Sequence, residues 1–407
     1  MFLLKLAFLN IGRNPRRSII TVLAVGVGLA ALIFLWGFGD GTNEQMRENA
    51  IRLLTGHIQI HASDFRRTLS PELTLPNRTE LLEKIKSMAA ISAVTERVQC
   101  EALIGTSEKS RGVLLTGIDP DREARVTDLS KHIKQGAFLS PEDNRKVLIG
   151  DRLAEKIGLQ IGDKVVVMSQ AIDGTLAGYA YQIKGIFHTG SQTLDEVSAY
   201  ITLGSAQELL SLETETHEIV IRLSNRRAVS SSISELKKLA ASDSYEIAAW
   251  NDIIPEIEQW VLWSEAIIRT ILLAVMVVIG VSIMNTVLMS VFERTREFGV
   301  MMAIGTTPGQ IIRLILLETF VLELFGILLG VIGGYLVTFY FGQVGIGFPE
   351  LEQAFSRSYM STVTYTRVEW AHVAQSIVTL FILTTFIGLY PAWKASRMEP
   401  IKAIYRP

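Results

Sequence analysis

The sequence predicts a membrane protein with four transmembrane helices and a large α+β domain on the extracytoplasmic side. Hydrophobic residues make up 49% of the 407 residues and the mean hydropathy is +0.32, yet 20% of the residues are charged. These values fit one chain only when charge and hydrophobicity are segregated along it. Four apolar segments each reach the length of about 20 residues that a hydrocarbon core requires.

The four apolar segments carry few charges. Residues 18–38 contain none, nor does 270–292, the apolar part of the second segment. The third contains Glu318 and Glu323, and the fourth contains His372 near its start. The first segment is longer than the hydrophobic region of a signal peptide and lacks a clear small-x-small cleavage site before Asp40, so we interpret it as an uncleaved helix.

Positive charges beside the spans predict that both termini are cytoplasmic. Four basic residues and no acid precede the first span, and the tail has four basic residues and one acid. The predicted parts are an interfacial helix (1–17), the spans (18–38, 264–292, 314–341 and 370–393), an outer domain (39–263), a cytoplasmic hairpin (293–313), an outer loop (342–369) and a cytoplasmic tail (394–407).

The first residues, "MFLLKLAFLNIGRNP", place apolar side chains on one helical stripe beside basic ones. This pattern predicts an amphipathic helix lying on the membrane surface, which Pro15 separates from the first span. The alternative is that these residues extend the first span.

The outer segment mixes strand and helix patterns. "GHIQIHA", "YAYQIKGIF" and "HEIVIRL" alternate as strands do, whereas "SSISELKKLAAS" has the period of an amphipathic helix. His57 and His61 would share one strand face, but two imidazoles without cysteine or clustered acids predict surface or turn residues rather than a metal pair. We therefore expect no metal site.

Several function classes are disfavoured by composition. The single cysteine, Cys100, excludes an intramolecular disulfide and is expected to be a small buried hydrophobe. A net charge of −2 argues against a nucleic-acid partner. No nucleophile elbow, HExxH motif or paired-carboxylate spacing supports an enzyme.

The hairpin reads "ERTREFGVMMAIGTTPGQI". Gly305 suits the left-handed residue that ends a helix, and Thr307 to Gln310 predict the capped start of the next one. We therefore expect the second helix to continue to Ile304, forming a rigid protrusion whose Phe298, Met301 and Met302 face a partner. The alternative is a hairpin that only holds two helices together, with Arg294 and Arg296 as positive anchors.

The third span has two further features. Gly326, Gly330 and Gly334 form a stripe that permits close helix approach. Glu318 and Glu323 should each face protein, water or lipid headgroups, because an unpaired carboxylate in lipid is costly. We expect Glu318 to order the base of the hairpin, through a pair with Arg269 or Arg313.

These motifs resemble the FtsX/MacB/LolC-LolE permeases, the membrane subunits of type VII ABC transporters. The hairpin, the third span "LLETFVLELFGILLGVIGGYL" and the tail "YPAWKASRMEPIKAI" are similar to that family, and "IGDRLAEKIGLQIGDKV" to its outer domain. The resemblance implies a MacB-like periplasmic core domain between helices 1 and 2, and a bacterial inner membrane location. It also implies that hairpin and tail contact the ATPase, through Glu293, Arg294, Arg296, Glu297, Phe298, Gly299, Met301, Met302, Gly305, Lys394 and Arg397.

The chain has no GxxxxGK[ST] motif and no Gly-Lys dipeptide. We therefore expect a non-catalytic subunit without a cofactor, while two separate ATPase subunits bind ATP and Mg²⁺. The resemblance further implies a second permease chain, lipid contacts and a periplasmic lipoprotein carrier or adaptor. A proton relay at Glu318 is disfavoured, because ATP supplies the energy.

Three functions remain open. The chain resembles LolC and LolE, which implies lipoprotein release from the inner membrane. A MacB-like permease would instead expel peptides, toxins or drugs, and an FtsX-like one would activate a cell-wall hydrolase. Chain length and the separate ATPase favour the first, and the size of the outer domain disfavours the third.

Overall fold

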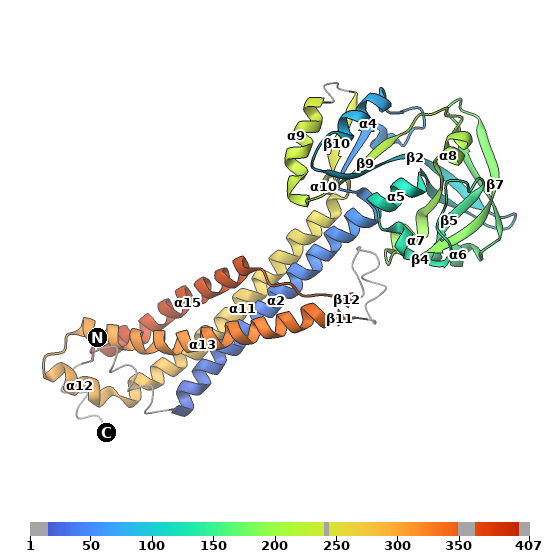
Figure 1. Ribbon diagram of the computed structural model, residues 1–407. Helices are drawn as coiled ribbons and strands as arrows, with labels where there is room; N and C mark the ends of the chain where they lie inside the picture. The colour runs from blue at the N-terminus through green and yellow to red at the C-terminus, as the bar shows by residue number, and fades with distance from the viewer. Residues whose placement is uncertain (1–14, 240–243, 349–362, 399–407) are drawn as a thin grey trace. The chain divides into compact units, whose positions relative to one another are not determined.

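The computed structural model describes residues 15–239, 244–348 and 363–398 (Figure 1). The chain divides into two compact units. Of the described residues, the membrane-helix unit comprises 15–43, 261–347 and 363–398, and the α+β unit comprises 44–239, 244–260 and 348. The predicted interfacial helix up to residue 14 and the tail from residue 399 lie outside the described residues.

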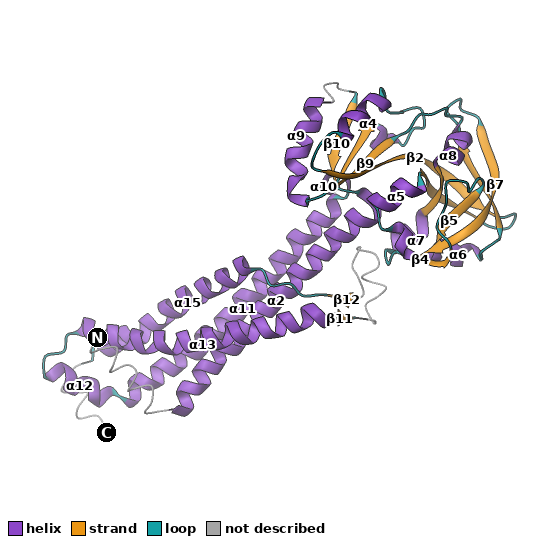
Figure 2. Ribbon diagram, viewed as in Figure 1, coloured by secondary structure: helices purple, strands orange, loops and turns teal. Residues whose placement is uncertain are grey.

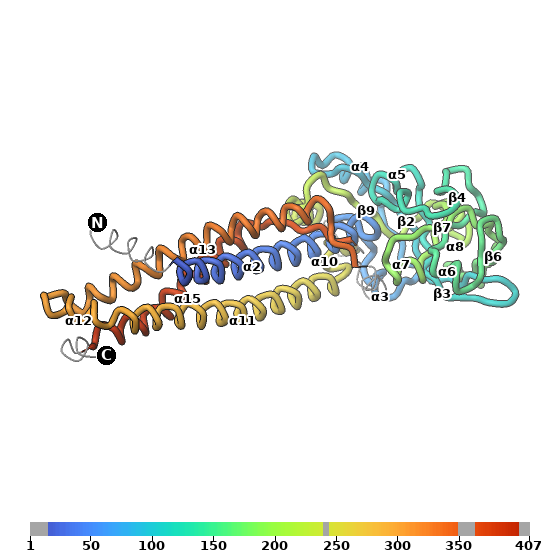
Figure 3. The backbone as a smooth tube through the Cα atoms, turned by 90° about the horizontal axis from the view of Figure 1, so that it is seen from below, coloured from blue at the N-terminus to red at the C-terminus, as the bar shows by residue number. Residues whose placement is uncertain are grey.

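Among the described residues, four helices are long and apolar enough to cross a membrane, which confirms the membrane-helix part of the predicted fold class. They are α2 (Pro15–Ala50), α11 (Pro255–Glu293), α13 (Pro308–Val344) and α15 (Trp370–Ser396). Figures 1 and 3 show them running alongside one another. Short strands β11 (Ile346–Gly347) and β12 (Val363–Thr364) pair between α13 and α15.

The first two helices are longer than their apolar segments. α2 continues to Ala50, twelve residues beyond the predicted span end at Phe38, and α11 begins at Pro255 rather than near residue 264. Hydropathy marks the part of a helix that suits lipid, whereas helix ends depend on caps and on helix-forming polar residues such as those in "EQMRENA".

The membrane-helix unit has an apolar interior and an apolar surface. Its core includes Leu29 of α2, Met276 of α11, Leu314 of α13 and Leu380 of α15. Many large apolar side chains also face outward, among them Leu328, Ile332, Leu336 and Phe386. A helix bundle whose outer surface is apolar suits a hydrocarbon surrounding, in which helices satisfy their own backbone groups.

The α+β unit is built on a ten-stranded sheet (Figure 2). The strand order is β10-β1-β9-β2-β3-β8-β5-β7-β4, and β6 pairs with both β2 and β7. Strands β2, β3, β8, β5, β7 and β6 thus form a closed ring. The strands are β1 (Ile58–Ala62), β2 (Ile91–Gly105), β3 (Ser110–Ile118), β4 (Ile133–Gly136), β5 (Lys146–Gly150), β6 (Lys164–Gln170), β7 (Leu176–Phe187), β8 (Ser198–Thr202), β9 (Glu218–Leu223) and β10 (Tyr245–Ala249).

The α+β unit has separate apolar cores. One fills the strand ring, with Val98, Leu115 and Tyr181 buried in it. Another lies between strands β1 and β9 and helices α4 and α9, around Ile60, Ile85 and Leu236. The helices are α3 (Phe65–Thr68), α4 (Arg78–Lys86), α5 (Pro120–Val126), α6 (Asp151–Ile157), α7 (Gln192–Val197), α8 (Leu203–Leu210), α9 (Val229–Leu239) and α10 (Trp250–Ile253).

The expectation that His57 and His61 are surface or turn residues is wrong. Both are buried, His61 within β1, because this strand lies between β10 and β9 in the sheet interior. His61 Nε2 lies 3.0 Å from Gln59 Oε1, and burial lowers the pKa of His61 to about 3. Burial also lowers the pKa of His57. Cys100 is buried, as expected.

Candidate coupling site

The predicted hairpin is a short helix between α11 and α13. α11 ends at Glu293, α12 covers Thr295–Ala303, and α13 begins at Pro308. Gly305 has φ +103°, the left-handed conformation expected of it. The predicted capping box is present, since Thr307 N donates to Gln310 Oε1 at 2.9 Å.

The expectation of one continuous helix to Ile304 is wrong, because the helix breaks at Arg294 (φ −105°, ψ 14°). Thr295 Oγ1 donates to the carbonyls of Val291 and Phe292, at 3.1 and 2.9 Å. Such bonding of a threonine hydroxyl to the preceding helical turn bends helices. The break therefore sets α12 apart as an element of its own.

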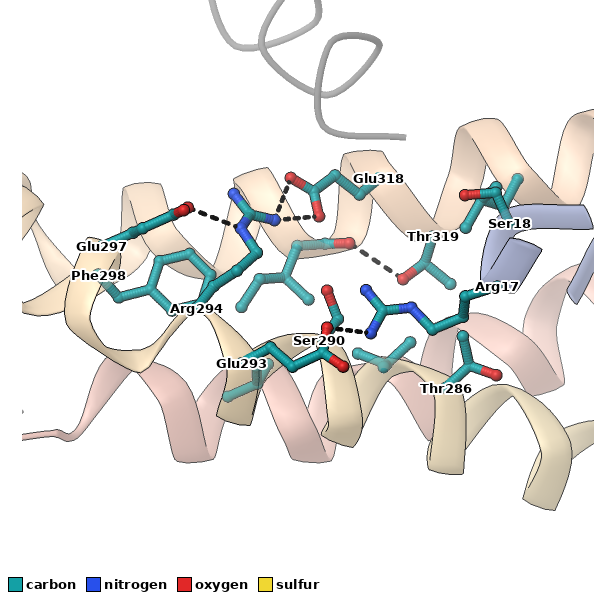
Figure 4. Close-up of a pocket in the computed structure, with 14 residues that line it drawn as sticks. Arg17, Ser18, Thr286, Ser290, Glu293, Arg294, Glu297, Phe298, Glu318 and Thr319 are labelled. Atoms are coloured by element: carbon teal, nitrogen blue, oxygen red, sulfur yellow. Dashed lines mark hydrogen bonds and ion pairs between the residues drawn. The ribbon is translucent and has the colours of Figure 1, made fainter. Parts of the chain in front are cut away.

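Arg294 joins the break to α13 (Figure 4). Its Nη1 donates to both carboxylate oxygens of Glu318, at 2.9 and 2.8 Å, and its Nε donates to Glu297 Oε2 at 3.0 Å. The Arg294 and Glu318 side chains are each 13% exposed, and the guanidinium lies 5.0 Å from the Phe298 ring centroid. Two charge-assisted bonds to one carboxylate fix direction as well as distance.

The expectation that Glu318 pairs with Arg269 or Arg313 is therefore wrong. Arg269 lies 25 residues before Arg294 on α11, about 37 Å along the axis, and pairs with Glu265. Arg313 is five residues before Glu318 on the same helix, and this spacing points the two side chains in different directions.

A cleft of about 270 Å³ lies beside this ion pair. Arg17 of α2 lines it and donates from Nη1 to Glu293 Oε2 at 2.8 Å (Figure 4). The same cleft is lined by Thr286 and Ser290 of α11 and by Thr319 of α13. Charged and hydroxyl groups of three long helices thus meet at the base of the hairpin.

The face of α12 that turns outward differs from the predicted one. Phe298 is only 1% exposed and belongs to the core, and Gly299 is also buried, so the expectation that Phe298 faces a partner is wrong. Met301 and Met302 are half-buried against the same core. α12 packs its Phe298 side back onto the bundle, which sequence periodicity alone does not reveal.

Three exposed residues four apart, Arg296, Val300 and Ile304, run along α12 and its end; we call them the α12 ridge. Val300 is 46% exposed and Ile304 is 78% exposed. Sequence reasoning singled out Arg296 but missed the other two. Their signal was the spacing of four, which places them on one helical stripe.

The predicted tail contacts lie at the end of α15. Lys394 and Arg397 are exposed, and Lys394 Nζ lies 5.6 Å from the ring centroid of Phe292 at the end of α11. Arg397 lies 4.6 Å from the Trp393 ring centroid. Lys394 thus lies beside the end of α11, where the hairpin begins.

The glycine stripe faces α2 within the same chain. A Cβ atom on Gly326 would lie 2.6 Å from Val25 Cβ, and one on Gly330 would lie 2.8 Å from the carbonyl oxygen of Gly26. On Gly334 it would lie 2.8 Å from Ile33 Cβ. The stripe thus lets the α13 backbone approach α2 closely.

The second intramembrane acid also faces protein. Glu323 is 3% exposed on α13, and Thr384 of α15 donates from Oγ1 to Glu323 Oε1 at 2.5 Å. This hydrogen bond links α13 to α15 and offsets the free-energy cost of placing the carboxyl group among apolar side chains.

Three potential metal ligands, Asp151, His188 and Asp195, meet in the α+β unit, and they are the one such group in the part of the chain that the structure describes. His188 Nδ1 lies 3.0 Å from Asp151 Oδ2 and 3.2 Å from Asp195 Oδ2. Lys134 Nζ lies 2.8 Å from the same Asp151 oxygen. Because this ammonium already neutralises part of the negative charge, we interpret the group as an ion-pair cluster.

Comparison with known proteins agrees with this architecture. Residues 18–239 match the family model of the MacB-like periplasmic core domain, and residues 269–400 match that of the FtsX-like permease C-terminal region. The chain is 23% identical over 409 residues to the lipoprotein-releasing system transmembrane protein LolC of Neisseria meningitidis, covering 96% of this chain and 95% of that one.

Two other relatives are similar at comparable identity. The uncharacterized ABC transporter permease YknZ of Bacillus subtilis is 23% identical, with 98% of each chain covered. The macrolide export ATP-binding/permease protein MacB of a Shewanella species is 24% identical over 99% of this chain but only 60% of its own length. Since one family model covers more than half of these 407 residues, the chain belongs to the FtsX-like permeases of ABC transporters that carry a MacB-like periplasmic core domain.

Proposed function

We propose that this bacterial inner-membrane permease receives ATP-driven motion from a separate ATPase through the α12 ridge. The observation that carries the proposal is the ridge itself, two exposed apolar side chains and one cation on a short helix fixed at both ends. An exposed apolar surface outside the spans suits contact with another protein.

The hairpin is stiff enough for this role. Arg294 and its bonds to Glu318 hold one end of α12, and the Thr307 capping box holds the start of α13. Phe298 anchors the middle in the bundle core. A force applied to the α12 ridge therefore moves α11 and α13 together, whereas a flexible loop would deform and not transmit the movement.

The orientation and partners are part of the proposal. Basic residues before α2 and after α15 support cytoplasmic termini, with the hairpin on the same side and the α+β unit on the other. Two ATPase subunits would bind ATP and Mg²⁺, and a second permease chain would complete the transporter. Lys394 and Arg397 would add contacts beside the ridge.

For the substrate, we propose the release of lipoproteins from the inner membrane, with delivery to a periplasmic carrier. Support comes from LolC, a lipoprotein-releasing system transmembrane protein, since this chain matches 95% of its length. The second candidate is MacB-like export of peptides, toxins or drugs through an adaptor, since identity to MacB is just as high.

The test is a substitution in the ridge, made in the chain co-expressed with the ABC ATPase that we expect to be encoded beside it. Ile304→Asp places a carboxylate in the contact, where it would have to lose its hydration, so co-purification of the ATPase should be lost. The matched control is Leu176→Asp, which alters an apolar residue of similar exposure, 74% against 78%, in the α+β unit. Equal ATPase recovery with both variants at unchanged chain abundance would refute the assignment.

A further inference from the structure

The first membrane helix enters the α+β unit through an uninterrupted helical path. α2 passes directly into a π-helical turn, η1 (Ile51–Thr55), which Gly56 N closes by donating to Ile51 O at 3.0 Å. His57 N then donates to Ile221 O of β9 at 2.9 Å. Only Gly56 and His57 separate the helix from β1. Single π-turns are rare and frequently occur at functional positions.

One arginine of β2, Arg97, forms hydrogen bonds that hold this turn in place. Arg97 Nη1 donates to the carbonyl oxygen of Leu54 at 2.9 Å and to Glu218 Oε1 of β9 at 3.0 Å. Its Nε and Nη2 donate to the two oxygens of Glu123 on α5, at 3.0 and 2.6 Å. Thr127 Oγ1 donates to Glu123 Oε1 at 2.8 Å and orients that carboxylate.

The hydrogen bonds of Arg97 are buried and directional. The side chains of Arg97, Glu123 and Glu218 are 4%, 1% and 1% exposed. A planar guanidinium that bonds in three directions fixes the rotation of each group it holds. The helix end is held on its other side too, because Asp128 N donates to Arg52 O at 2.7 Å and Arg52 Nη1 donates to Asp128 Oδ2 at 3.3 Å.

The second membrane helix is attached in a different way. α10 ends at Ile253, the next residue Ile254 is non-helical (φ −124°, ψ 72°), and α11 starts at Pro255. The break is packed by an apolar cluster that includes Met46, Trp250 and Ile257. Apolar contact resists separation but is not directional, so it allows small rotations. Arg66 adds an exposed bond to the Asp252 carbonyl at 2.8 Å.

We infer that Arg97 is the positioning residue that couples α2 rigidly to the α+β unit, and that motion enters this unit through α2 while α11 turns at Ile254–Pro255. This inference goes beyond the proposed function, from which it takes only the source of the motion. No local pattern around Arg97 predicts this role, since Glu123, Glu218 and Leu54 lie 26, 121 and 43 positions away from it.

The first test is hydrogen exchange of the whole chain in lipid discs, without the ATPase. Arg97→Lys keeps the charge that neutralises the two glutamates, but one ammonium nitrogen with three N–H donors cannot replace the four hydrogen bonds that the guanidinium makes from three nitrogens. We expect amides 51–57 to exchange at least tenfold faster while those of 218–223 are unchanged. The matched control, Arg66→Lys, should speed exchange at 250–254 and leave 51–57 as they are.

Unchanged protection of 51–57 in Arg97→Lys would overturn the inference, and so would equal acceleration across the whole unit, because Arg97 would then serve folding alone. If Arg97→Lys does not fold, Thr127→Val tests the same contact through the orientation of Glu123 without altering charge. It should speed exchange at 51–57 by a smaller factor, and unchanged exchange there would overturn the inference.

The second test uses the chain assembled with its ATPase. In the unaltered chain, ATP should change amide exchange in the α+β unit. In Arg97→Lys, ATP hydrolysis should continue while that change is lost, and Arg66→Lys should keep it. If ATP has no effect on the unaltered chain, the proposed function fails. If Arg97→Lys responds like the unaltered chain, the positioning role fails.

Discussion

The sharpest prediction concerns two glycines of α13 that lie three positions apart. A Cβ on Gly330 would lie 2.8 Å from the carbonyl oxygen of Gly26 and 2.8 Å from Leu29 Cβ. A Cβ on Gly333 would meet only Ala30 Cβ, at the ordinary contact distance of 3.8 Å. Alanine at Gly330 therefore forces α13 away from α2, whereas alanine at Gly333 fits without movement.

The expected changes in the free energy of unfolding distinguish the two variants. Replacing glycine by alanine inside a helix favours the helix by about 1 kcal/mol at either position. Overpacking at Gly330 costs about 1–3 kcal/mol, because the backbone carbonyl of Gly26 cannot turn aside as a side chain can. Gly330→Ala should therefore be less stable than Gly333→Ala by about 1–3 kcal/mol, and Gly333→Ala should equal or exceed the unaltered chain.

The assay is thermal unfolding of the purified chain in one detergent, followed by tryptophan fluorescence. At about 2–4 °C per kcal/mol, the two midpoints should differ by several degrees. A second control, Leu328→Phe on the outward face of α13, should unfold like the unaltered chain, since Leu328 is 58% exposed. Equal midpoints for Gly330→Ala and Gly333→Ala would refute the role of close helix contact.

Two further predictions follow from burial. The pKa of His61 is lowered from 6.5 to about 3 in the folded chain, so the unfolded chain takes up this proton first as the pH falls. His61 should therefore lower the free energy of unfolding below pH 6.5, by about 2 kcal/mol at pH 5. In thermal unfolding at pH 7 and pH 5, His61→Gln should show a drop smaller by that amount, while buried His57 and His217 still contribute. A drop equal to that of the unaltered chain would contradict the assignment. Phe298→Ala should lower the free energy of unfolding by about 3–5 kcal/mol and reduce the recovery of folded chain. The control Val300→Ala should change neither the free energy of unfolding nor the recovery. Equal recovery of the two variants would show that Phe298 is not a core residue.

The sequence was most informative where local chemistry decides structure. Charge-free runs marked the four helices, and Gly305 with Thr307 and Gln310 marked the turn and the start of α13. These features depend on a few neighbouring residues and on the length of a run. The alternating strand patterns also predicted β1, β7 and β9 at their positions.

Tertiary contacts explain the errors. The hairpin sequence predicts Phe298 on the outside of a protrusion, because it does not show that α12 packs onto the bundle. The expected partners of Glu318 omit Arg294, although the helical rise alone places Arg269 about 37 Å along the axis from Arg294. His57 and His61 were misplaced because the burial of a strand depends on its neighbours in the sheet, which the pattern of one strand does not show.

Two arginines, one in each unit, hold carboxylates by directional bonds, Arg294 at the hairpin and Arg97 at the end of α2. If motion passes through both in turn, losing either link should stop it. Lysine at both positions should then leave a fraction of the ATP-dependent change in the α+β unit equal to the product of the fractions that the two single variants keep. Two separate routes would instead make the two single losses add. The measurement is ATP-dependent amide exchange in the three variants, and additive losses would show that the two links act separately rather than in series.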